Sequence, residues 1–272
     1  MIEILATGPL ATVQDLGRPG FAALGVARSG AFDRGAAAQA NRLVGNPIGA
    51  PVIEVTLGGL ALRVVDAATV AVTGAHCPGV EHGSAQSLAA GRQLMMGPPA
   101  RGLRSYVAVR GGFAVELTLG SASTDLLSGL GPAPLRVGDV LGVGPQPGGH
   151  VSEAAAPDRA TGVALRVSAG PRADWFSPDA MTDLLAQTWT VRPESDRVGV
   201  RLEGSPLRRA ITAELPSEPT RPGAIQVPAD GRPIIFGPDA PVTGGYPVLA
   251  VVADLDPAAQ LRPGDQVRFA LV

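Results

Sequence analysis

The sequence contains no lysine, since all 22 of its basic residues are arginine. Lysine supplies the ammonium group of phosphate-binding loops, the amine that forms Schiff bases with carbonyl cofactors, and the attachment point of biotin and lipoate. The residues of this chain therefore cannot provide those chemistries. A step that needs one of them has to involve another polypeptide.

Cysteine, aromatic residues and long apolar stretches are also scarce. The single cysteine, Cys77, excludes an intramolecular disulfide and a thiolate zinc site, which fits a reducing compartment. Aromatic residues make up 4% of the chain, and 36 Gly and 26 Pro among 272 residues disfavour long helical bundles. Residues 1–10 show no basic leader, and no stretch approaches the roughly 18 apolar residues of a membrane-spanning helix. We therefore expect a cytoplasmic protein with no membrane partner.

The residues that are present suit a globular protein with a buried core. Hydrophobic residues make up 45% of the chain, charged residues 17%, and the net charge is −2. This composition lacks the low hydropathy and high charge of disordered segments. It also lacks the positive charge that attracts nucleic acid or anionic membranes, so neither is an expected partner.

A stretch rich in glycine, proline and alanine divides the chain. Residues 144–162 carry no strand or helix periodicity, which is typical of a linker. We predict an N-terminal domain at residues 1–150, a linker at 151–162 and a C-terminal domain at 163–272.

The two halves repeat a series of landmarks in the same order. Gly8-Pro9 is echoed by Gly170-Pro171, and residues 135–139 (LRVGD) are echoed by residues 261–265 (LRPGD). Such repeats favour an internal duplication. The alternative is chance, because short glycine-containing strings recur in a sequence this rich in glycine.

Most of the remaining signals are short β-branched runs bounded by Gly, Pro or Asp, which are typical of strands. The predicted strands are residues 69–73, 105–109, 163–168, 224–227, 233–236, 246–252 and 267–272. Only two helices are predicted, one capped by Asp33 and ended by Gly45, the other capped by Ser177 with Pro178 following. Many short strands with few helices favour closed sheets, because closure removes exposed edges. The predicted fold class is mainly β, with two barrel-like domains and a few short helices.

Two polar clusters lie near the N-terminus. Gln14, Asp15 and Arg18 share a loop shaped by Gly and Pro, where they could orient a polar substrate. The alternative is a turn stabilised by an Asp15–Arg18 pair and by side-chain-to-backbone bonds. Residues 29–33 (SGAFD) begin a helix and would suit an anion, but a plain helix cap accounts for Asp33 equally well.

Three further clusters leave functional and structural interpretations open. His76, Cys77 and His82 resemble part of a zinc site, but no second cluster completes the ligand sphere, so we predict no metal. Residues 193–199 (PESDRVG) could position a substrate carboxylate or relay a proton, or could form a self-satisfied polar corner. Residues 243–246 (TGGY) could bring backbone close to a ligand, or could simply form a tight turn.

Ordered strings along the whole chain resemble the bacterial family that contains the C subunit of 5-oxoprolinase. The family is also called biotin-dependent carboxyltransferase or allophanate hydrolase subunit 2, and it includes Kip-type antagonists of kinase inhibitors. The matching strings are residues 12–18, 25–26, 29–33, 40–46, 52–56, 104–109, 111–112, 120–124, 195–197, 223–228 and 243–247.

The resemblance implies a pair of cyclophilin-like β-barrel domains and a place in a heteromeric enzyme. Its partners would be a sibling similar to the B subunit of 5-oxoprolinase and a protein similar to the A subunit, with ATP used by the complex to open the lactam of 5-oxoproline to glutamate. The chain would then be an ATP-dependent amide (lactam) hydrolase subunit that is active only in the complex. One alternative is a biotin-dependent carboxyltransferase subunit of the urea carboxylase type, with biotin on a partner. Another is a non-catalytic regulator of a kinase-inhibitor protein.

The resemblance also implies the site residues, which would lie in a cleft between the domains and a partner subunit. Those expected to act in catalysis are Asp15, Glu54, Asp196 and Tyr246. Those expected to bind substrate are Gln14, Arg18, Ser29, Asp33, Asn41, Arg104, Tyr106, Ser195, Arg197, Gln226 and Thr243. The arginines would hold a carboxylate, Asp15 or Glu54 would handle protons or a metal, and Tyr246 would donate to a developing oxyanion.

The sequence departs from the family pattern at several positions. Phe32 stands where Met is usual in the family, and Gly59 stands where Pro is common. Val200 stands where a Tyr often follows the Asp-Arg motif. Pro241 and Val242 replace a Gln-Thr pair that normally precedes the TGGY string. If that pair touches substrate, its loss would alter specificity or abolish turnover, because neither new side chain donates a hydrogen bond.

Overall fold

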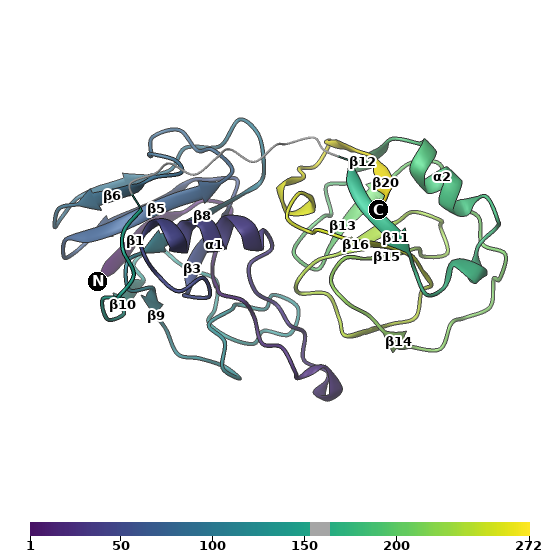
Figure 1. Ribbon diagram of the computed structural model, residues 1–272, viewed down its shortest axis with the longest axis horizontal. Helices are drawn as coiled ribbons and strands as arrows, with labels where there is room; N and C mark the ends of the chain where they lie inside the picture. Colours follow the sequence, from purple (N-terminus) through teal and green to yellow (C-terminus); the bar gives the residue numbers. More distant parts are fainter. Residues whose placement is uncertain (153–163) are drawn as a thin grey trace. The chain divides into compact units, whose positions relative to one another are not determined.

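The computed structural model describes residues 1–152 and 164–272, so most of the predicted linker at 151–162 lies outside the described residues. The chain divides into two compact units (Figure 1). Of the described residues, unit 1 holds 1–18, 29–125 and 129–152, and unit 2 holds 19–28, 126–128 and 164–272. The domain limits at residues 150 and 163 remain predictions.

Unit 1 consists of two five-stranded antiparallel sheets and one α-helix among its described residues. The first sheet has the order β7-β4-β1-β10-β9, and the second has the order β2-β3-β8-β5-β6. The strands are β1 (Ile2–Thr7), β2 (Leu10–Gln14), β3 (Val52–Thr56), β4 (Leu60–Val64), β5 (Ala68–Gly74), β6 (Ala85–Leu88), β7 (Gln93–Met95), β8 (Arg104–Val109), β9 (Phe113–Ala114) and β10 (Val140–Val143). Gly8 joins β1 to β2 with φ of +64°, and a Cβ there would lie 1.9 Å from the Gly58 carbonyl oxygen, so only glycine fits this turn.

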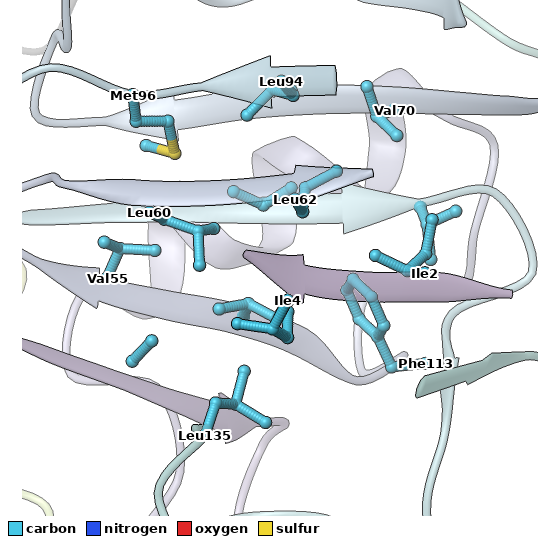
Figure 2. Close-up of a cluster of buried hydrophobic side chains, with 14 of the residues drawn as sticks. Ile2, Ile4, Val55, Leu60, Leu62, Val70, Leu94, Met96, Phe113 and Leu135 are labelled. Atoms are coloured by element: carbon cyan, nitrogen blue, oxygen red, sulfur yellow. The ribbon is translucent and has the colours of Figure 1, made fainter. Parts of the chain in front are cut away.

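The core of unit 1 receives side chains from both sheets (Figure 2). Ile2 and Ile4 of β1 and Leu60 of β4 meet Val55 of β3 in one buried cluster. Alternate residues of each strand point to the same face, because the side-chain period of a strand is two residues. Val13, Ile53 and Val107 therefore face this core, and their neighbours in sequence face the other way.

The helix α1 (Arg34–Leu43) covers the opposite face of the second sheet. Its buried residues Ala36, Ala40 and Leu43 pack against Val52 and Ala108 of that face. The side chain of Asp33 accepts a hydrogen bond from the Ala36 N–H at 2.8 Å, and Gly45 follows the helix with φ of +74°. The predicted cap and stop of this helix are therefore confirmed.

Unit 2 is dominated by one eight-stranded sheet with the order β19-β12-β13-β16-β15-β18-β11-β20. The two end strands are neighbours in the chain, so the sheet curls until its edges nearly meet. Its strands are β11 (Leu165–Ala169), β12 (Trp189–Val191), β13 (Gly199–Glu203), β15 (Ala224–Gln226), β16 (Ile234–Phe236), β18 (Val248–Val252), β19 (Gln266–Val267) and β20 (Phe269–Leu271), with β14 (Glu218–Pro219) and β17 (Thr243–Gly244) forming a separate pair. A nearly closed barrel sheet and a mainly β chain confirm the predicted fold class.

The second helix begins later than the sequence predicts. The helix α2 (Ala180–Ala186) has Asp179 at its N-cap position, without a side-chain cap bond. The predicted cap at Ser177 is wrong, because the Ser177 carbonyl accepts from the Ala180 N–H in a turn that precedes the helix. The remaining helices, η1 (Ala22–Leu24), η2 (Ala173–Trp175) and η3 (Ala258–Gln260), are single 3₁₀ turns. In the part of the chain that the structure describes, no helix has the length and apolar character required to cross a bilayer.

The two LRxGD landmarks form the same turn. In the first, the Asp139 Oδ2 atom accepts from the Arg136 N–H at 2.7 Å, and in the second the Asp265 Oδ2 atom accepts from the Arg262 N–H at 2.8 Å. The glycine before each aspartate has φ near +90°, at +92° and +89°. This shared geometry supports the predicted duplication.

Candidate functional site

A row of polar side chains crosses four strands of unit 1 on the face that α1 covers. The strand register places Thr12 opposite Glu54, Glu54 opposite Tyr106, and Tyr106 opposite Thr73. All four side chains are buried. Polar groups in such a place need hydrogen-bond partners, and the row finds them in its own members, in the first residues of α1 and just before it, and in Gln14.

Glu54 is the centre of this row. Its Oε2 atom accepts from the Phe32 N–H at 2.9 Å and from the Tyr106 hydroxyl at 2.8 Å. Burial and the neighbouring Glu54 and Asp33 carboxylates raise the pKa of Tyr106 well above its ordinary value. The phenol therefore stays protonated and remains a donor to Glu54.

Two more of the predicted site residues meet Glu54 at the start of α1. The Arg104 Nε atom lies 3.4 Å from Glu54 Oε1, and its guanidinium carbon lies 4.4 Å from the centre of the Phe32 ring. The backbone N–H of Asp33 donates to the Tyr106 hydroxyl oxygen at 2.7 Å. The structure thus brings Asp33, Glu54, Arg104 and Tyr106 into one buried cluster.

Asp15 organises a second cluster in unit 1. Its Oδ1 atom accepts from the hydroxyls of Ser121 and Ser123, each at 2.6 Å, and from the Gly17 N–H at 2.7 Å. Its Oδ2 atom accepts from the Ala122 N–H at 2.7 Å. With four donors around it, the carboxylate fixes the loop at residues 121–123 against the loop that follows β2.

Arg18 also contacts this distant loop and makes no ion pair with the Asp15 carboxylate. Its Nε atom donates to the Thr118 carbonyl at 3.3 Å, and its Nη2 atom donates to the Ser123 carbonyl. The alternative prediction of an Asp15–Arg18 pair is therefore wrong. The physical reason is that the carbonyls of residues 118 and 123 accept from Arg18, while hydroxyl and N–H groups of residues 121–123 donate to Asp15, so each charged group has partners in that loop without a direct pair.

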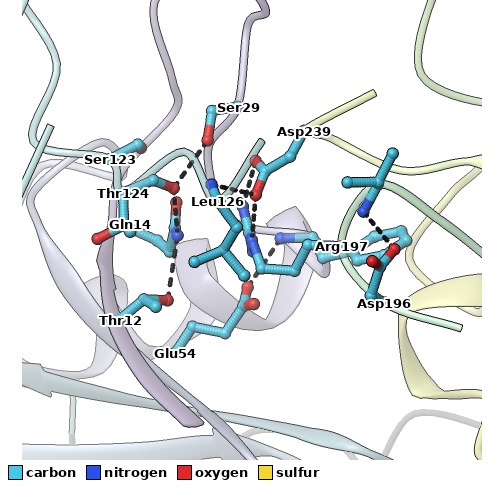
Figure 3. A network of polar contacts seen from close by, with 12 residues as sticks. Thr12, Gln14, Ser29, Glu54, Ser123, Thr124, Leu126, Asp196, Arg197 and Asp239 are labelled. Carbon is cyan, nitrogen blue, oxygen red and sulfur yellow. Dashed lines mark hydrogen bonds and ion pairs between the residues drawn. The ribbon is translucent and has the colours of Figure 1, made fainter. Parts of the chain in front are cut away.

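Gln14 and Ser29 converge on Thr124 (Figure 3). The Gln14 Nε2 atom donates to the Thr124 carbonyl at 3.0 Å and to the Thr12 hydroxyl at 3.1 Å, and the Ser29 hydroxyl donates to the same carbonyl at 3.0 Å. Ser29 adopts a φ of +54°, which is strained for a residue with a side chain. Two buried atoms here, Gln14 Oε1 and Thr124 Oγ1, have no hydrogen-bond partner in the described residues.

The unpaired hydroxyl of Thr124 predicts how the free energy of unfolding responds when this hydroxyl is removed. Replacing Thr124 with Val removes a buried polar atom that has no partner in the described residues, so we expect a free energy of unfolding that is unchanged or about 1 kcal/mol higher. Thr73→Val is the matched control, because the buried Thr73 hydroxyl donates to the Ala36 carbonyl at 2.7 Å. That control should lower the free energy of unfolding by about 1 kcal/mol in urea titrations. An equal loss in both variants would contradict the assignment.

Asn41 and the histidines lie in other contacts. The Asn41 Nδ2 atom donates to the Ala50 carbonyl at 2.8 Å and so fixes the loop that follows α1. The rings of His76 and His82 lie 4.9 Å apart, and the buried Cys77 sulfur lies 3.3 Å from the Ser105 hydroxyl. No group of three His, Cys, Asp or Glu side chains in residues 1–152 and 164–272 is placed to hold a metal ion.

In unit 2, Arg197 forms a buried ion pair. Its Nε and Nη2 atoms donate to the two carboxylate oxygens of Asp239, at 2.9 and 3.0 Å, and both side chains are at most 1% exposed. Asp239 Oδ2 also accepts from the Leu126 N–H at 3.1 Å (Figure 3). Both oxygens of the carboxylate therefore accept hydrogen bonds.

The neighbouring residues Ser195 and Asp196 shape the turn before β13. The Asp196 Oδ1 atom accepts from the N–H groups of Val198 and Gly199, at 2.9 and 3.0 Å. The Ser195 hydroxyl accepts from the Arg201 N–H at 3.0 Å. These contacts agree with the polar-corner interpretation, while Asp196 itself is exposed.

The predicted residues Gln226, Thr243 and Tyr246 gather at the ends of β15 and β17. The buried Gln226 donates through Nε2 to the Tyr246 carbonyl at 3.0 Å. Thr243 is exposed, and Tyr246 is 48% exposed with no hydrogen bond from its hydroxyl to the described residues. The guanidinium of Arg209 lies 5.9 Å from the centre of the Tyr246 ring.

Comparison with known proteins decides the family. A model of the carboxyltransferase domain, subdomain A and B, matches residues 24–271. The chain belongs to this carboxyltransferase-domain family. The predicted family resemblance is therefore confirmed.

Individual relatives cover the chain from end to end. It is 36% identical over 280 residues to the 5-oxoprolinase C subunit of Escherichia coli (strain K12), covering 99% of this chain and 90% of that protein. The crystal structure of TTHA0988 matches with a TM-score of 0.88 and 36% identity, over 99% of this chain and 55% of that one. The K. lactis urea amidolyase structure matches with a TM-score of 0.93 and 30% identity, over 100% of this chain and 18% of that one. The chain thus spans about half of the first solved structure and a smaller part of the second.

In this carboxyltransferase-domain chain, three residues that were not among the predicted site residues stand out in the structure. Asp239 pairs with Arg197, Thr124 holds a hydroxyl with no partner in the described residues, and Arg209 lies beside Tyr246. No periodicity or motif surrounds Arg209, so no signal in the sequence distinguishes it from other arginines. Asp239 follows a Gly-Pro turn after β16, where an aspartate commonly serves only to stabilise the turn.

Proposed function

We propose that this chain is the C subunit of a 5-oxoprolinase, which opens the lactam of 5-oxoproline to glutamate. The observation that carries the proposal is the match to the Escherichia coli 5-oxoprolinase C subunit, which covers 99% of this chain and 90% of that protein at 36% identity. The similarity therefore extends over nearly the whole of both sequences, rather than over one shared domain. Function in a carboxyltransferase-domain family is otherwise broad, so this extent is the decisive support.

The proposed reaction couples lactam opening to ATP. Water adds to the lactam carbonyl carbon and the C–N bond breaks to give the amino group of glutamate, while a second water is consumed as ATP is converted to ADP and phosphate. A phosphate-binding lysine cannot come from this chain, which has none, so ATP is handled with partners similar to the A and B subunits. The catalytic contribution of this chain is made within that complex.

The contacts suggest how the predicted residues divide their roles. Asp15 and Glu54 each accept several hydrogen bonds, so we assign them to fixing the loops and strands around the site. The Tyr246 hydroxyl makes no hydrogen bond to the described residues, which suits donation to the oxyanion that forms when water attacks an amide carbonyl. Asp196 is exposed and retains an oxygen, Oδ2, with no hydrogen bond to the described residues, which suits proton transfer.

Reconstitution tests the proposal. The chain should co-purify with the A-like and B-like proteins, and the complex should release ADP only when 5-oxoproline is present. Tyr246→Phe should lower kcat by about 100- to 1,000-fold, as removal of an oxyanion donor does, without changing co-purification. Full activity of Tyr246→Phe would show that Tyr246 is not the oxyanion donor. Failure of the wild-type complex to release ADP in response to 5-oxoproline would refute the function.

A second candidate function is carboxyl transfer in an enzyme of the urea carboxylase type. The similarity to K. lactis urea amidolyase, with a TM-score of 0.93, favours it. Carboxybiotin would be presented by a partner, since this chain has no lysine to carry biotin. Biotin-dependent incorporation of labelled bicarbonate, blocked by avidin, would establish this reaction, and ADP release that is insensitive to avidin would exclude it.

A further inference from the structure

The arginines predicted to hold a substrate carboxylate are almost completely buried. Arg18, Arg104 and Arg197 expose at most 3% of their surface. Their guanidinium groups contact backbone carbonyls, Glu54 and Asp239, respectively. A substrate such as 5-oxoproline carries a carboxylate, and a less buried cation is better placed to recognise it.

A cavity of about 340 Å³ in unit 2 offers such a cation. Its lining includes Arg208, Arg209, Thr212, Asp230 and Gly231. A Cβ on Gly231 would lie 2.8 Å from the Leu207 carbonyl oxygen, and the Leu207 N–H donates to the Gly231 carbonyl at 2.9 Å. The backbone at Leu207 and the backbone at Gly231, which both line the cavity, are therefore held close together. A volume of this size suits a small organic molecule.

Arg209 holds unused hydrogen-bond donors beside this cavity. Its Nη2 atom donates to the Val227 carbonyl at 2.6 Å, which fixes the position of the guanidinium. Its Nε atom is buried without a partner among the described residues, and its Nη1 atom makes no hydrogen bond to them. A buried unpaired donor on a positive group is unfavourable unless a ligand satisfies it. Tyr246, whose carbonyl is held by Gln226, lies beside the same guanidinium.

The charges around the cavity favour an anion. Arg208 is exposed and makes no side-chain hydrogen bond or ion pair within the described residues. The one carboxylate of the lining, Asp230, accepts from the Arg232 N–H at 3.1 Å and lies 3.7 Å from the Arg232 guanidinium. The lining thus contains two arginines and a single carboxylate, and that carboxylate already has Arg232 as its partner.

We propose that this cavity binds the carboxylate of a small acid, with Arg209 as the main binding residue and Arg208 adding positive charge. The acid is the lactam acid 5-oxoproline, an identity that rests on the proposed function. Tyr246 contacts both the Arg209 guanidinium and the solvent, so a lactam ring anchored by its carboxylate lies within the same unit as the predicted oxyanion donor.

The experiment is an NMR titration of the full-length chain with three probes. They are 5-oxoproline, 2-pyrrolidinone, which has the lactam but no carboxylate, and acetate, which has only the carboxylate. The amide signals of Leu207 and Gly231 report on the cavity. Arg209→Gln should weaken 5-oxoproline binding by about 10- to 100-fold, as loss of a charge-assisted hydrogen bond does. Arg209→Lys should retain part of the affinity because it keeps the charge.

The matched control is Arg166→Gln, which removes the same charge from an exposed position on β11 and should leave binding unchanged. Amide spectra of both Arg209 variants verify that unit 2 is folded. Binding of 5-oxoproline that is equal in wild type and Arg209→Gln, or the absence of any shift with 5-oxoproline and acetate, would overturn the site. If acetate binding depends on Arg209 but 5-oxoproline binds no more tightly than acetate, the anion site stands and the 5-oxoprolinase function fails. Turnover of 5-oxoproline by an Arg209→Gln complex with an unchanged KM would refute the site while the function stands.

Discussion

Replacement of Asp239 by Ala is expected to lower the free energy of unfolding of unit 2 by about 3–5 kcal/mol. The Asp239 carboxylate accepts from two nitrogen atoms of Arg197 and from the Leu126 N–H, and it is completely buried. Its removal leaves these donors without that acceptor and leaves a buried guanidinium without its counter-charge. Loss of one partner from a buried pair is far more destabilising than loss of an exposed pair.

Tryptophan fluorescence in a urea titration measures this loss selectively. The two tryptophans of the chain, Trp175 and Trp189, both belong to unit 2. The control is Glu218→Gln, which breaks the partly exposed ion pair between Arg172 and Glu218 in the same unit. We expect a much smaller shift of the unfolding midpoint for the control. Similar shifts for the two variants would show that the burial of the Arg197–Asp239 pair has no energetic consequence.

Replacement of Glu54 by Gln is expected to destabilise unit 1 by a similar amount, about 3–5 kcal/mol. The change preserves the shape of the side chain but removes the negative charge that lies 3.4 Å from Arg104. It also weakens the acceptor for the Phe32 N–H and the Tyr106 hydroxyl, which join the start of α1 to β8. The helix start and the sheet are therefore expected to loosen together.

Amide hydrogen exchange measured by mass spectrometry reads out this effect, because unit 1 contains no tryptophan. Peptides that cover β3, β8 and α1 should exchange faster in Glu54→Gln. Glu3→Gln is the control, since the Glu3–Arg63 pair is a partly exposed ion pair of the same unit, and such pairs contribute about 0–1 kcal/mol. Faster exchange in the control than in Glu54→Gln would contradict the central place given to Glu54.

The local signals of the sequence predicted the first helix and the fold class well. Asp33 caps the helix through a contact three residues away, and Gly45 ends it through its own backbone conformation. Both roles can therefore be predicted without knowledge of the fold. Ser177 shows the limit of such signals, because its carbonyl joins a turn that delays the helix by two residues. Very short strands such as β14 and β17 were not predicted, because two residues carry no periodicity and depend on pairing with each other across the fold.

The sequence singled out several residues that the structure brings together, but it did not predict their contacts. Glu54, Tyr106, Arg104 and Asp33 were all expected to act, and they do meet. The partners of Asp15 in the loop at 121–123 lie more than 100 residues away in the chain, and Asp239 lies 42 residues from Arg197. Contacts over such separations are set by the sheet topology, which no single motif encodes. The same limit concealed Arg209, whose importance follows from a cavity and an unpaired donor.

We propose that this carboxyltransferase-domain chain is required for lactam opening by a 5-oxoprolinase that also contains A-like and B-like proteins. The direct measurement is glutamate formed from 5-oxoproline, followed together with ADP, with the A-like and B-like proteins present and this chain either added or omitted. We predict that glutamate and ADP appear in equal amounts and only when the chain is added. Equal glutamate formation without the chain, or ADP release without glutamate in its presence, would contradict the claim.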